Sequence, residues 1–216
     1  MNWSEQAWTS IESINHEIKQ LPFLHELMEG TLPMEKFYFY LRQDAIYLAE
    51  YGKILASIGT KLEDTAQRTT FLQFAAETVA VEAALHESYL KNAPAATYKG
   101  ASPSCLLYTG FLAKQLSFYP IETALAAVLP CFWIYKMVGD YILAHQTTAE
   151  NPYQPWIDTY GSEGFAESVR KAIAICDAAA AQAPHLQDAM TEAFVYASKM
   201  EWMFWDSAYR MEQWAV

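Results

Sequence analysis

Apolar residues recur at helical spacing along nearly the whole chain. Intervals of three and four residues separate them, which is the pattern of amphipathic α-helices. In one stretch, for example, Phe37, Leu41, Leu48 and Tyr51 follow this spacing. The chain has no two-residue hairpin signal between runs of alternating apolar and polar residues. The pattern therefore predicts an all-α protein.

Residues that favour helix ends divide the chain into segments. The expected helical segments are Trp3 to about Leu21, one from Pro33, one from Asp64 with Gln67 as an N-terminal cap box, one from Ser102–Pro103, Ile121 to His145, about Ser162 to Gln182, and about His185 to Trp214. Asn151–Pro152 opens a short connecting stretch that Gly161 ends. The chain has no low-complexity linker and no internal repeat. We therefore expect residues 1–216 to form a single-domain helical bundle.

Composition limits the possible partners. The chain has 216 residues, of which 53% are hydrophobic, so it is large enough to bury a sizeable core. Its formal net charge is −11. Because nucleic-acid binding requires clusters of Lys and Arg, this charge argues against a nucleic-acid partner.

The sequence predicts a cytoplasmic protein. The N-terminus carries Glu5 and Glu12 and lacks the basic-then-apolar pattern of a signal peptide. The uncharged stretch Thr123 to Tyr135 is too short to span a bilayer, so we expect no membrane partner. The three cysteines form no C-x-x-C pair, and an odd, sparse set is typical of reduced thiols.

Cys131 is the first candidate for chemistry. It follows Pro130 in the apolar, helix-like run Leu129–Tyr135. A proline inside a helix removes one backbone hydrogen bond and kinks the chain, which opens room beside the next side chain. Tyr135 lies four residues on, on the same predicted face. Two interpretations stay open at this point: an inert core thiol, or a nucleophile in an aromatic pocket.

Two carboxylates lie among aromatic residues. Asp44 shares its predicted face with Tyr40, Tyr47 and Tyr51, and Glu201 lies in a segment rich in methionine and tryptophan. Burying an acid is costly unless it is paired, protonated or bonded to a ligand. The alternative is an acid at the edge of an apolar stripe that reaches water. Two such acids together with a cysteine on a third apolar helix favour a pocket.

Other types of site receive little support. Glu82 and His86 are four residues apart, but a ferritin-like metal site needs Glu-x-x-His on two helices and further glutamates on two others. No such pattern is present, so we predict no metal site. The chain also lacks a G-x-S-x-G elbow and a glycine-rich phosphate loop.

Six motifs in order give the chain a resemblance to a known family. They are Gly30–Thr31–Leu32–Pro33 with Phe37, Gln43–Asp44–Ala45–Ile46–Tyr47, Ala84–Leu85–His86, Leu129–Pro130–Cys131–Phe132–Trp133–Ile134–Tyr135, Trp156–Ile157–Asp158–Thr159–Tyr160–Gly161, and Glu201–Trp202–Met203–Phe204–Trp205–Asp206–Ser207–Ala208–Tyr209. The chain resembles the TenA family, also called thiaminase II, in its cysteine-containing class. The resemblance covers nearly the whole sequence.

The resemblance implies a haem-oxygenase-like helical bundle without haem, assembled as a homotetramer. It also implies a cofactor-independent hydrolase of 4-amino-2-methylpyrimidines substituted at the 5-methylene. Thiamin and the aminomethyl pyrimidine left by thiamin breakdown are such compounds, and the activity would serve thiamin salvage. Two other functions stay open: a pyrimidine- or thiamin-binding protein without activity, and a metal-dependent oxidase on a related bundle.

The resemblance also implies residue roles. Cys131 matches the family nucleophile, Glu201 the acid that handles ring protons, and Asp44 the carboxylate that binds the aminopyrimidine. The matching pocket residues are Tyr47, Tyr108, Tyr135 and Tyr160. Phe132 replaces a tyrosine found in some members, and Ile46 stands where polar or aromatic residues occur. We expect these departures to affect substrate preference more than chemistry.

Overall fold

The computed structural model describes residues 1–85, 89–91, 93–95, 100–148 and 150–216. The described residues contain no β-strand, which confirms the all-α prediction. The helices are α1 (Trp3–Ser10), α2 (Glu12–Lys19), α3 (Pro22–Glu29), α4 (Met34–Lys61), α5 (Thr65–Leu85), α6 (Pro103–Phe118), α7 (Ile121–His145), α8 (Gln154–Gly161), α9 (Glu163–Gln182), the 3₁₀ helix η2 (Pro184–Leu186) and α10 (Gln187–Tyr209).

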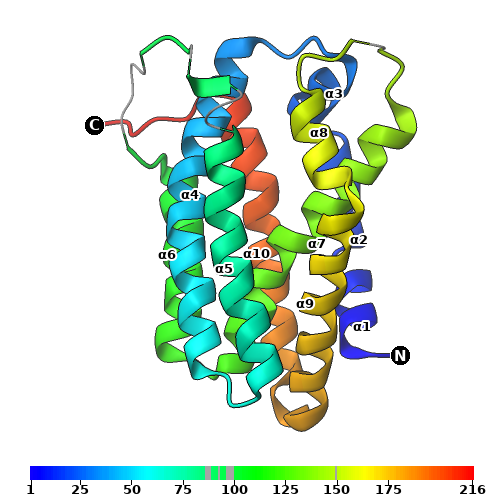
Figure 1. Cartoon of the computed structure of the whole chain (residues 1–216), viewed down its shortest axis with the longest axis vertical. Helices are drawn as coiled ribbons and strands as arrows, with labels where there is room; N and C mark the ends of the chain where they lie inside the picture. The colour runs from blue at the N-terminus through cyan, green and yellow to red at the C-terminus, as the bar shows by residue number, and fades with distance from the viewer. Residues whose placement is uncertain (86–88, 92, 96–99, 149) are drawn as a thin grey trace.

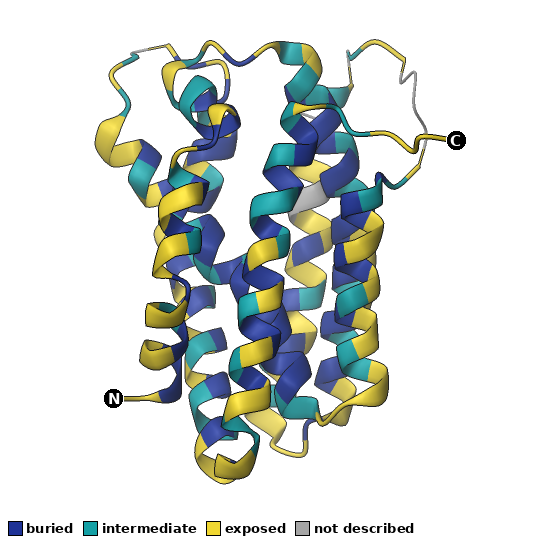
Figure 2. Ribbon diagram, turned by 180° about the vertical axis from the view of Figure 1, so that it is seen from behind, coloured by how far each residue is buried: buried dark blue, intermediate teal, exposed yellow. Residues whose placement is uncertain are grey.

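The long helices run roughly side by side along one axis (Figure 1). Helix α4 packs against α5 and α6, whereas α7 packs against α8, α9 and α10. Helix α10 also contacts α4 and α6, so it joins the two groups. Buried positions face the space between the helices, and exposed positions face outward (Figure 2). Helices α4, α7 and α10 therefore enclose the interior in which the candidate residues lie.

Several predicted helix ends are confirmed by their capping hydrogen bonds. The Ser102 hydroxyl accepts from the N–H of Cys105 at 3.2 Å, at the start of α6. The carboxylate of Asp64 accepts from the N–H of Gln67 at 2.8 Å, at the start of α5. Each bond satisfies a backbone donor that has no partner inside the helix.

The structure differs from the expected boundaries at two connections, and it adds helix α3, whose residues Pro22–Glu29 belong to no expected segment. The first segment breaks at Ile11, which has φ −109° and ψ 14° and is fully buried, so the chain turns around an anchored core residue. The expected connecting stretch after Pro152 contains helix α8, whose Trp156 and Ile157 are fully buried. A helix of only two turns is too short for its apolar period to be recognised in the sequence.

Helix α7 is the most apolar element of the bundle. By length and composition alone its 25 residues are sufficient to cross a membrane, although its longest uncharged run, Thr123–Tyr135, is too short to do so. However, 67% of the residues in its most apolar window are buried inside the protein, as in the core helix of a water-soluble bundle. Pro130 lies within α7, and the helix continues through it. The proline is itself buried. Cys131 follows it directly.

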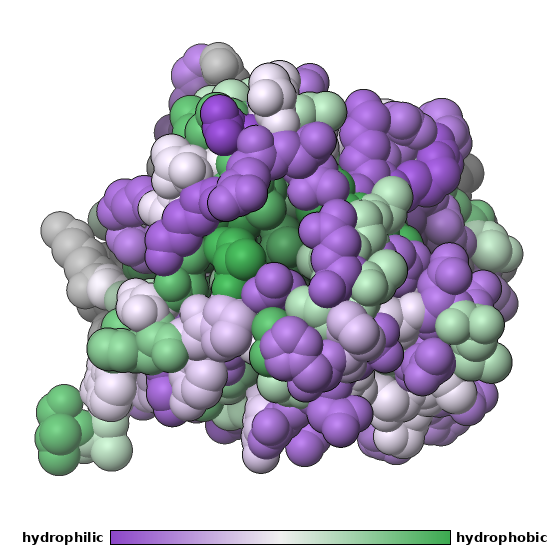
Figure 3. Space-filling view, turned by 90° about the horizontal axis from the view of Figure 1, so that it is seen from below, coloured by the Kyte–Doolittle hydropathy of each residue, from purple (hydrophilic) through white to green (hydrophobic). Residues whose placement is uncertain are grey.

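The end of the bundle in Figure 3 is covered largely by hydrophilic side chains. Hydrophobic side chains are visible in a hollow near the centre of this face and at several places along its edge (Figure 3). This distribution is expected where amphipathic helices turn their apolar faces toward a common interior.

Candidate active site

A pocket opens between α4, α5, α7, α8 and α9. Its wall includes Asp44, Cys131, Tyr135 and Tyr160, four of the residues singled out in the sequence. The other lining residues are Leu48, Tyr51, Phe74, Glu77, Thr78, Phe132, Thr159, Phe165 and Ser168. A concave, largely aromatic site with a few polar groups is the usual form of a small-molecule site.

Asp44 places a carboxylate in the wall of this pocket. Its residue is only 3% exposed, so it does not lie at the rim of an apolar stripe. The tyrosine rings of Tyr135 and Tyr160 lie near each other, with centroids 4.7 Å apart. The charge of Asp44 contributes to raising the pKa of both phenols, after burial, which is the main cause. The wall thus combines one acid with flat aromatic surfaces.

A second set of hydrogen bonds fixes the aromatic wall from behind. The hydroxyls of Tyr40 and Tyr135 are 3.2 Å apart and share a hydrogen bond. The indole N–H of Trp156 donates to the Tyr40 hydroxyl at 3.1 Å. Because Tyr40 and Trp156 are fully buried, this network holds Tyr135 in one orientation.

Cys131 is partly exposed to the pocket, unlike the other two cysteines. Burial raises the pKa of its thiol well above the usual value, and the charges of Glu201 and Asp44 raise it further. Interactions with the hydroxyls of Tyr47 and Tyr51 oppose this rise because they favour the thiolate. In the absence of a ligand the thiol therefore carries its proton at neutral pH.

Glu201 lies behind this wall, on α10, and is 1% exposed. The Tyr108 hydroxyl, from α6, donates a hydrogen bond to its Oε1 atom at 2.7 Å. Burial raises the pKa of Glu201 to about 8, although the Tyr108 hydrogen bond acts in the opposite direction. Near neutral pH the carboxyl group therefore holds a proton that it can donate.

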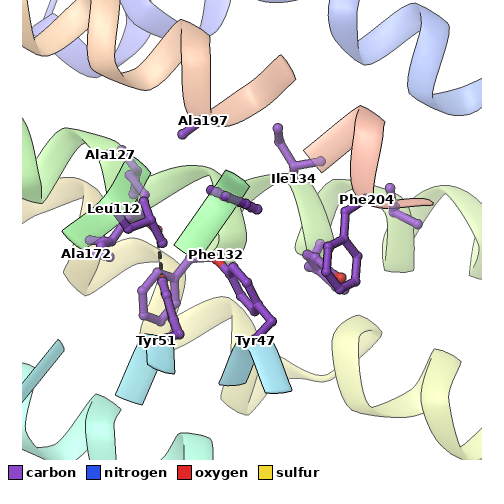
Figure 4. Packing of buried hydrophobic residues seen from close by; sticks show 14 of the residues in the cluster. Tyr47, Tyr51, Leu112, Ala127, Phe132, Ile134, Ala172, Ala197 and Phe204 are labelled. Atoms are coloured by element: carbon purple, nitrogen blue, oxygen red, sulfur yellow. Dashed lines mark hydrogen bonds between the residues drawn. The ribbon is translucent and has the colours of Figure 1, made fainter. Parts of the chain in front are cut away.

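Tyr47 lies between these two parts of the site. Its ring centroid is 4.9 Å from that of Tyr108 and 5.6 Å from that of Phe204. Figure 4 shows Tyr47 and Tyr51 extending from α4 toward α7. The Tyr47 hydroxyl is buried and has no partner of ordinary hydrogen-bond geometry among the described residues.

The structure brings together all seven residues predicted from the sequence. Four line the open pocket, whereas Glu201, Tyr47 and Tyr108 form its buried base. The two groups meet at Cys131, whose thiol interacts with Tyr47 and Glu201. An acid that simply reaches water is thereby excluded for Asp44 and for Glu201, because both are almost fully buried.

Sequence reasoning missed several lining residues. The sequence places Tyr51 on the same helix face as Asp44 but does not assign it to the site. In the structure its hydroxyl donates to the backbone carbonyl of Val128 at 2.8 Å. This bond joins α4 to α7 one turn from Cys131. The sequence does not distinguish Glu77, Thr159 and Ser168, which also line the pocket, from ordinary surface residues. Polar side chains on amphipathic helices usually face solvent.

The other two thiols lie in unsuitable surroundings. Cys105 is fully buried, its Sγ lies 3.6 Å from the Gln43 carbonyl, and burial raises its pKa to about 12. Cys176 is also buried, with Sγ 3.5 Å from the Leu125 carbonyl, and burial raises its pKa. Neither lines the pocket.

Within the described ranges, no three or more His, Cys, Asp and Glu side chains cluster as metal ligands would. His86 lies outside the described residues, as does the side chain of Glu82, so the structure does not place that pair.

Comparison with known proteins identifies the family to which this bundle and pocket belong. The model of the TENA/THI-4/PQQC family matches residues 8–211. The chain therefore belongs to the TENA/THI-4/PQQC family. It is 31% identical over 200 residues to the aminopyrimidine aminohydrolase of Bacillus subtilis, covering 90% of this chain and 84% of that protein.

Other relatives are longer than this chain. The thiamine biosynthesis multifunctional protein ThiED of Corynebacterium efficiens is 38% identical over 210 residues, covering 96% of this chain. The chain spans 28% of the length of that protein and 27% of the ThiED protein of Corynebacterium glutamicum.

Solved structures agree on the fold. A TenA homologue from P. horikoshii superposes with a TM-score of 0.84 at 26% identity, covering 97% of this chain and 99% of that one. A TenA homologue from Pyrococcus furiosus gives a TM-score of 0.88 at 19% identity, covering 95% and 99% of the two chains.

Proposed function

We propose that the protein is an aminopyrimidine aminohydrolase, or thiaminase II. It would hydrolyse 4-amino-2-methylpyrimidines substituted at the 5-methylene, without a cofactor, in thiamin salvage. The observation that carries this proposal is a buried carboxyl with a pKa of about 8 behind a pocket that presents a thiol and a second carboxylate. The relatives named aminopyrimidine aminohydrolase support it.

Asp44, Tyr135 and Tyr160 would bind the pyrimidine. The exocyclic amino group of the ring is a hydrogen-bond donor, and a buried carboxylate is a strong acceptor for it. The tyrosine rings offer flat surfaces on which the pyrimidine can stack. Burial raises the pKa values of these phenols, so their hydroxyls stay protonated and can donate to ring nitrogens.

The first chemical step would couple two proton transfers. Glu201 donates its proton to a ring nitrogen, and the resulting carboxylate takes up the proton of the Cys131 thiol as sulfur attacks the adjacent ring carbon. A C–S bond forms, and the π electron pair moves to the protonated nitrogen. Because the unliganded site keeps the thiol protonated, the thiolate would form only as the ring takes up positive charge.

The second step would release the substituent. The electron-rich adduct expels the group on the 5-methylene, whose C–N bond pair leaves with nitrogen, and an exocyclic methylene forms. Water then adds to this methylene through its oxygen and loses one proton to the released amine or to solvent. The sulfur leaves with its electron pair, and the proton on the ring nitrogen returns through Glu201 to the thiolate, which restores aromaticity and yields the hydroxymethylpyrimidine.

Turnover of two substrates tests the proposal. We expect hydrolysis of 4-amino-5-aminomethyl-2-methylpyrimidine, of thiamin, or of both, with hydroxymethylpyrimidine as the product. The ratio of their kcat/KM values identifies the physiological leaving group. Saturable binding of both compounds without product would instead indicate a binding protein, and metal-dependent turnover would favour an oxidase.

We also propose a cytoplasmic homotetramer of single-domain chains. Helices α5 and α6 leave apolar side chains on their outer faces, including Val79 at 63% exposure and Phe118 at 81%. Subunit contacts would remove such surface from water. Light scattering across a dilution series checks the mass, and a monomer at every concentration would contradict the assembly.

A further inference from the structure

Three hydroxyl side chains that line the pocket donate their protons within their own helices, so toward a ligand they can accept but not donate hydrogen bonds. The hydroxyl of Thr78 donates its proton to the Phe74 carbonyl at 2.9 Å, within α5. The hydroxyl of Thr159 donates to the Pro155 carbonyl at 2.8 Å, within α8. A hydroxyl has one proton, so each of these oxygens keeps only acceptor lone pairs for a ligand.

Ser168 extends this pattern to the third helix at the mouth. Its hydroxyl donates to the Gly164 carbonyl at 3.4 Å, within α9. We call Glu77, Thr78, Thr159 and Ser168 the acceptor rim. Its members come from α5, α8 and α9, and all four line the pocket.

Glu77 gives the acceptor rim a negative charge. It is exposed on α5, and the side-chain amide of Gln73 donates to its Oε1 atom at 3.1 Å. This bond orients the carboxylate and leaves it capacity for further donors. Asp44 adds a second acid deeper in the wall, and none of the described lining residues is Lys, Arg or His.

The basic residue nearest to Ser168 along α9 is already neutralised. Arg170 forms ion pairs with Glu163 at 2.6 Å and with Glu167 at 2.7 Å. The electrostatic character of the mouth is therefore set by acids and by hydroxyl oxygens. Such a site attracts cations and hydrogen-bond donors, and it repels anions.

We propose that the acceptor rim selects substrates whose 5-methylene carries a cationic nitrogen, and that it rejects phosphorylated pyrimidines. This inference rests on the proposed function, and in it a pyrimidine held by Asp44 and the tyrosines would direct its 5-methylene substituent toward Glu77. An ammonium or a quaternary thiazolium would meet Glu77 and the three hydroxyl oxygens. A phosphate at the same position would face the carboxylate without a compensating base.

Charge at the rim also changes during the reaction. When the C–N bond breaks, its electron pair goes to nitrogen, so a bound ammonium leaves as neutral ammonia and a thiazolium as a neutral thiazole. Once the C–N bond has broken, the leaving group is neutral, so Glu77 no longer attracts it electrostatically. The rim thus favours substrate binding without retaining the product.

Equilibrium binding to a Cys131→Ser background tests this inference without turnover. The ligands are thiamin, 4-amino-5-aminomethyl-2-methylpyrimidine, and the neutral 4-amino-5-hydroxymethyl-2-methylpyrimidine with its phosphate ester. Glu77→Gln should weaken the two cationic ligands about two- to fivefold relative to the neutral alcohol, as expected for an exposed charge pair. Glu77→Gln should also reduce the difference in affinity between the neutral alcohol and its phosphate ester.

Two further variants sharpen the test. Thr78→Val removes one acceptor oxygen at nearly constant volume, and it should act in the same direction as Glu77→Gln. Glu63→Gln makes the same charge change in the exposed turn between α4 and α5, outside the pocket, and should leave all four affinities unchanged.

The two proposals fail in different ways. Equal effects of Glu77→Gln on cationic, neutral and anionic ligands would overturn the role of the acceptor rim while leaving the hydrolase intact. An absence of aminopyrimidine turnover by the wild-type protein would overturn the proposed function. If all ligands also failed to bind, both proposals would be wrong.

Discussion

The Tyr108 hydroxyl from α6 donates a 2.7 Å hydrogen bond to the carboxyl group of Glu201 on α10, inside the fully buried base of the pocket. This hydrogen bond favours the ionised carboxylate, whereas burial favours the protonated acid. Burial is the stronger effect, since the pKa of Glu201 rises to about 8. The pair thus gives the site an acid that is poised to exchange a proton near neutral pH.

Glu201→Gln should lower kcat by about 10²–10⁴-fold with a small change in KM. The amide fills the same space and can still accept from Tyr108, but it cannot deliver and recover a proton. Steady-state kinetics with the aminomethyl pyrimidine measures both constants. A rise in KM at unchanged kcat would show that Glu201 binds the ring instead of handling its protons.

Activity should fall as the pH rises through about 8, because Glu201 then loses the proton that activates the ring. Tyr108→Phe removes a hydrogen bond that favours the ionised form, so the pKa of Glu201 should rise and the alkaline limb should move to higher pH. The pH profile of kcat/KM checks both statements. A limb that moves to lower pH in Tyr108→Phe would contradict the assignment.

The same shift predicts a dependence of stability on pH. The folded pKa of Glu201 lies above the usual value of a free glutamate, so its contribution to folding is fully present below about pH 4.5 and is lost as the pH rises through about 8. The loss should be on the order of 5 kcal/mol for this 1% exposed group, because the pKa rises from 4.5 to about 8. Urea titrations of wild type and Glu201→Gln at several pH values isolate the contribution, because the variant should lack it.

Asp44→Asn should chiefly weaken pyrimidine binding. The amide fits the space, but its nitrogen offers a donor where the amino group of the ligand also donates. We expect KM and the dissociation constant for hydroxymethylpyrimidine to rise about tenfold or more, given the strength of hydrogen bonds to charged groups. A lower kcat with unchanged affinity would reverse the roles of the two acids.

The sequence singled out the candidate residues but did not indicate how they are arranged. Asp44, Cys131 and Glu201 were recognisable because a polar or reactive group amid apolar helical positions is costly and therefore informative. The division of the site into an open wall and a buried base was not predictable. This division depends on how α6 and α10 pack against α7, and the local sequence pattern of one helix does not predict its packing against others.

Other errors have equally physical causes. The periodicity ran through Ile11, whose burial is compatible with one long helix, yet the chain turns there because α1 and α2 follow different parts of the core. The proposed acceptor rim was not predictable from the sequence, because Thr78, Thr159 and Ser168 are ordinary helix residues there. They line one pocket only because three helices meet around it.

The three cysteines provide matched controls for the reaction. Cys105→Ala and Cys176→Ala should each retain turnover within about twofold, because both thiols are buried outside the pocket, although loss of core volume should destabilise each variant by about 1 kcal/mol. Thermal unfolding and kcat/KM of the soluble variants check the two effects. A loss of activity in a folded Cys105→Ala or Cys176→Ala protein would show that the wrong thiol was chosen.

Turnover of 4-amino-5-aminomethyl-2-methylpyrimidine by Cys131→Ser most directly tests covalent catalysis in this pocket. The hydroxyl is similar in size to the thiol but far less readily ionised, so the fold should persist while attack on the ring fails. The account predicts a fall in kcat of about 10³-fold or more, with hydroxymethylpyrimidine still bound at wild-type affinity. Wild-type turnover by a correctly folded Cys131→Ser protein would contradict it.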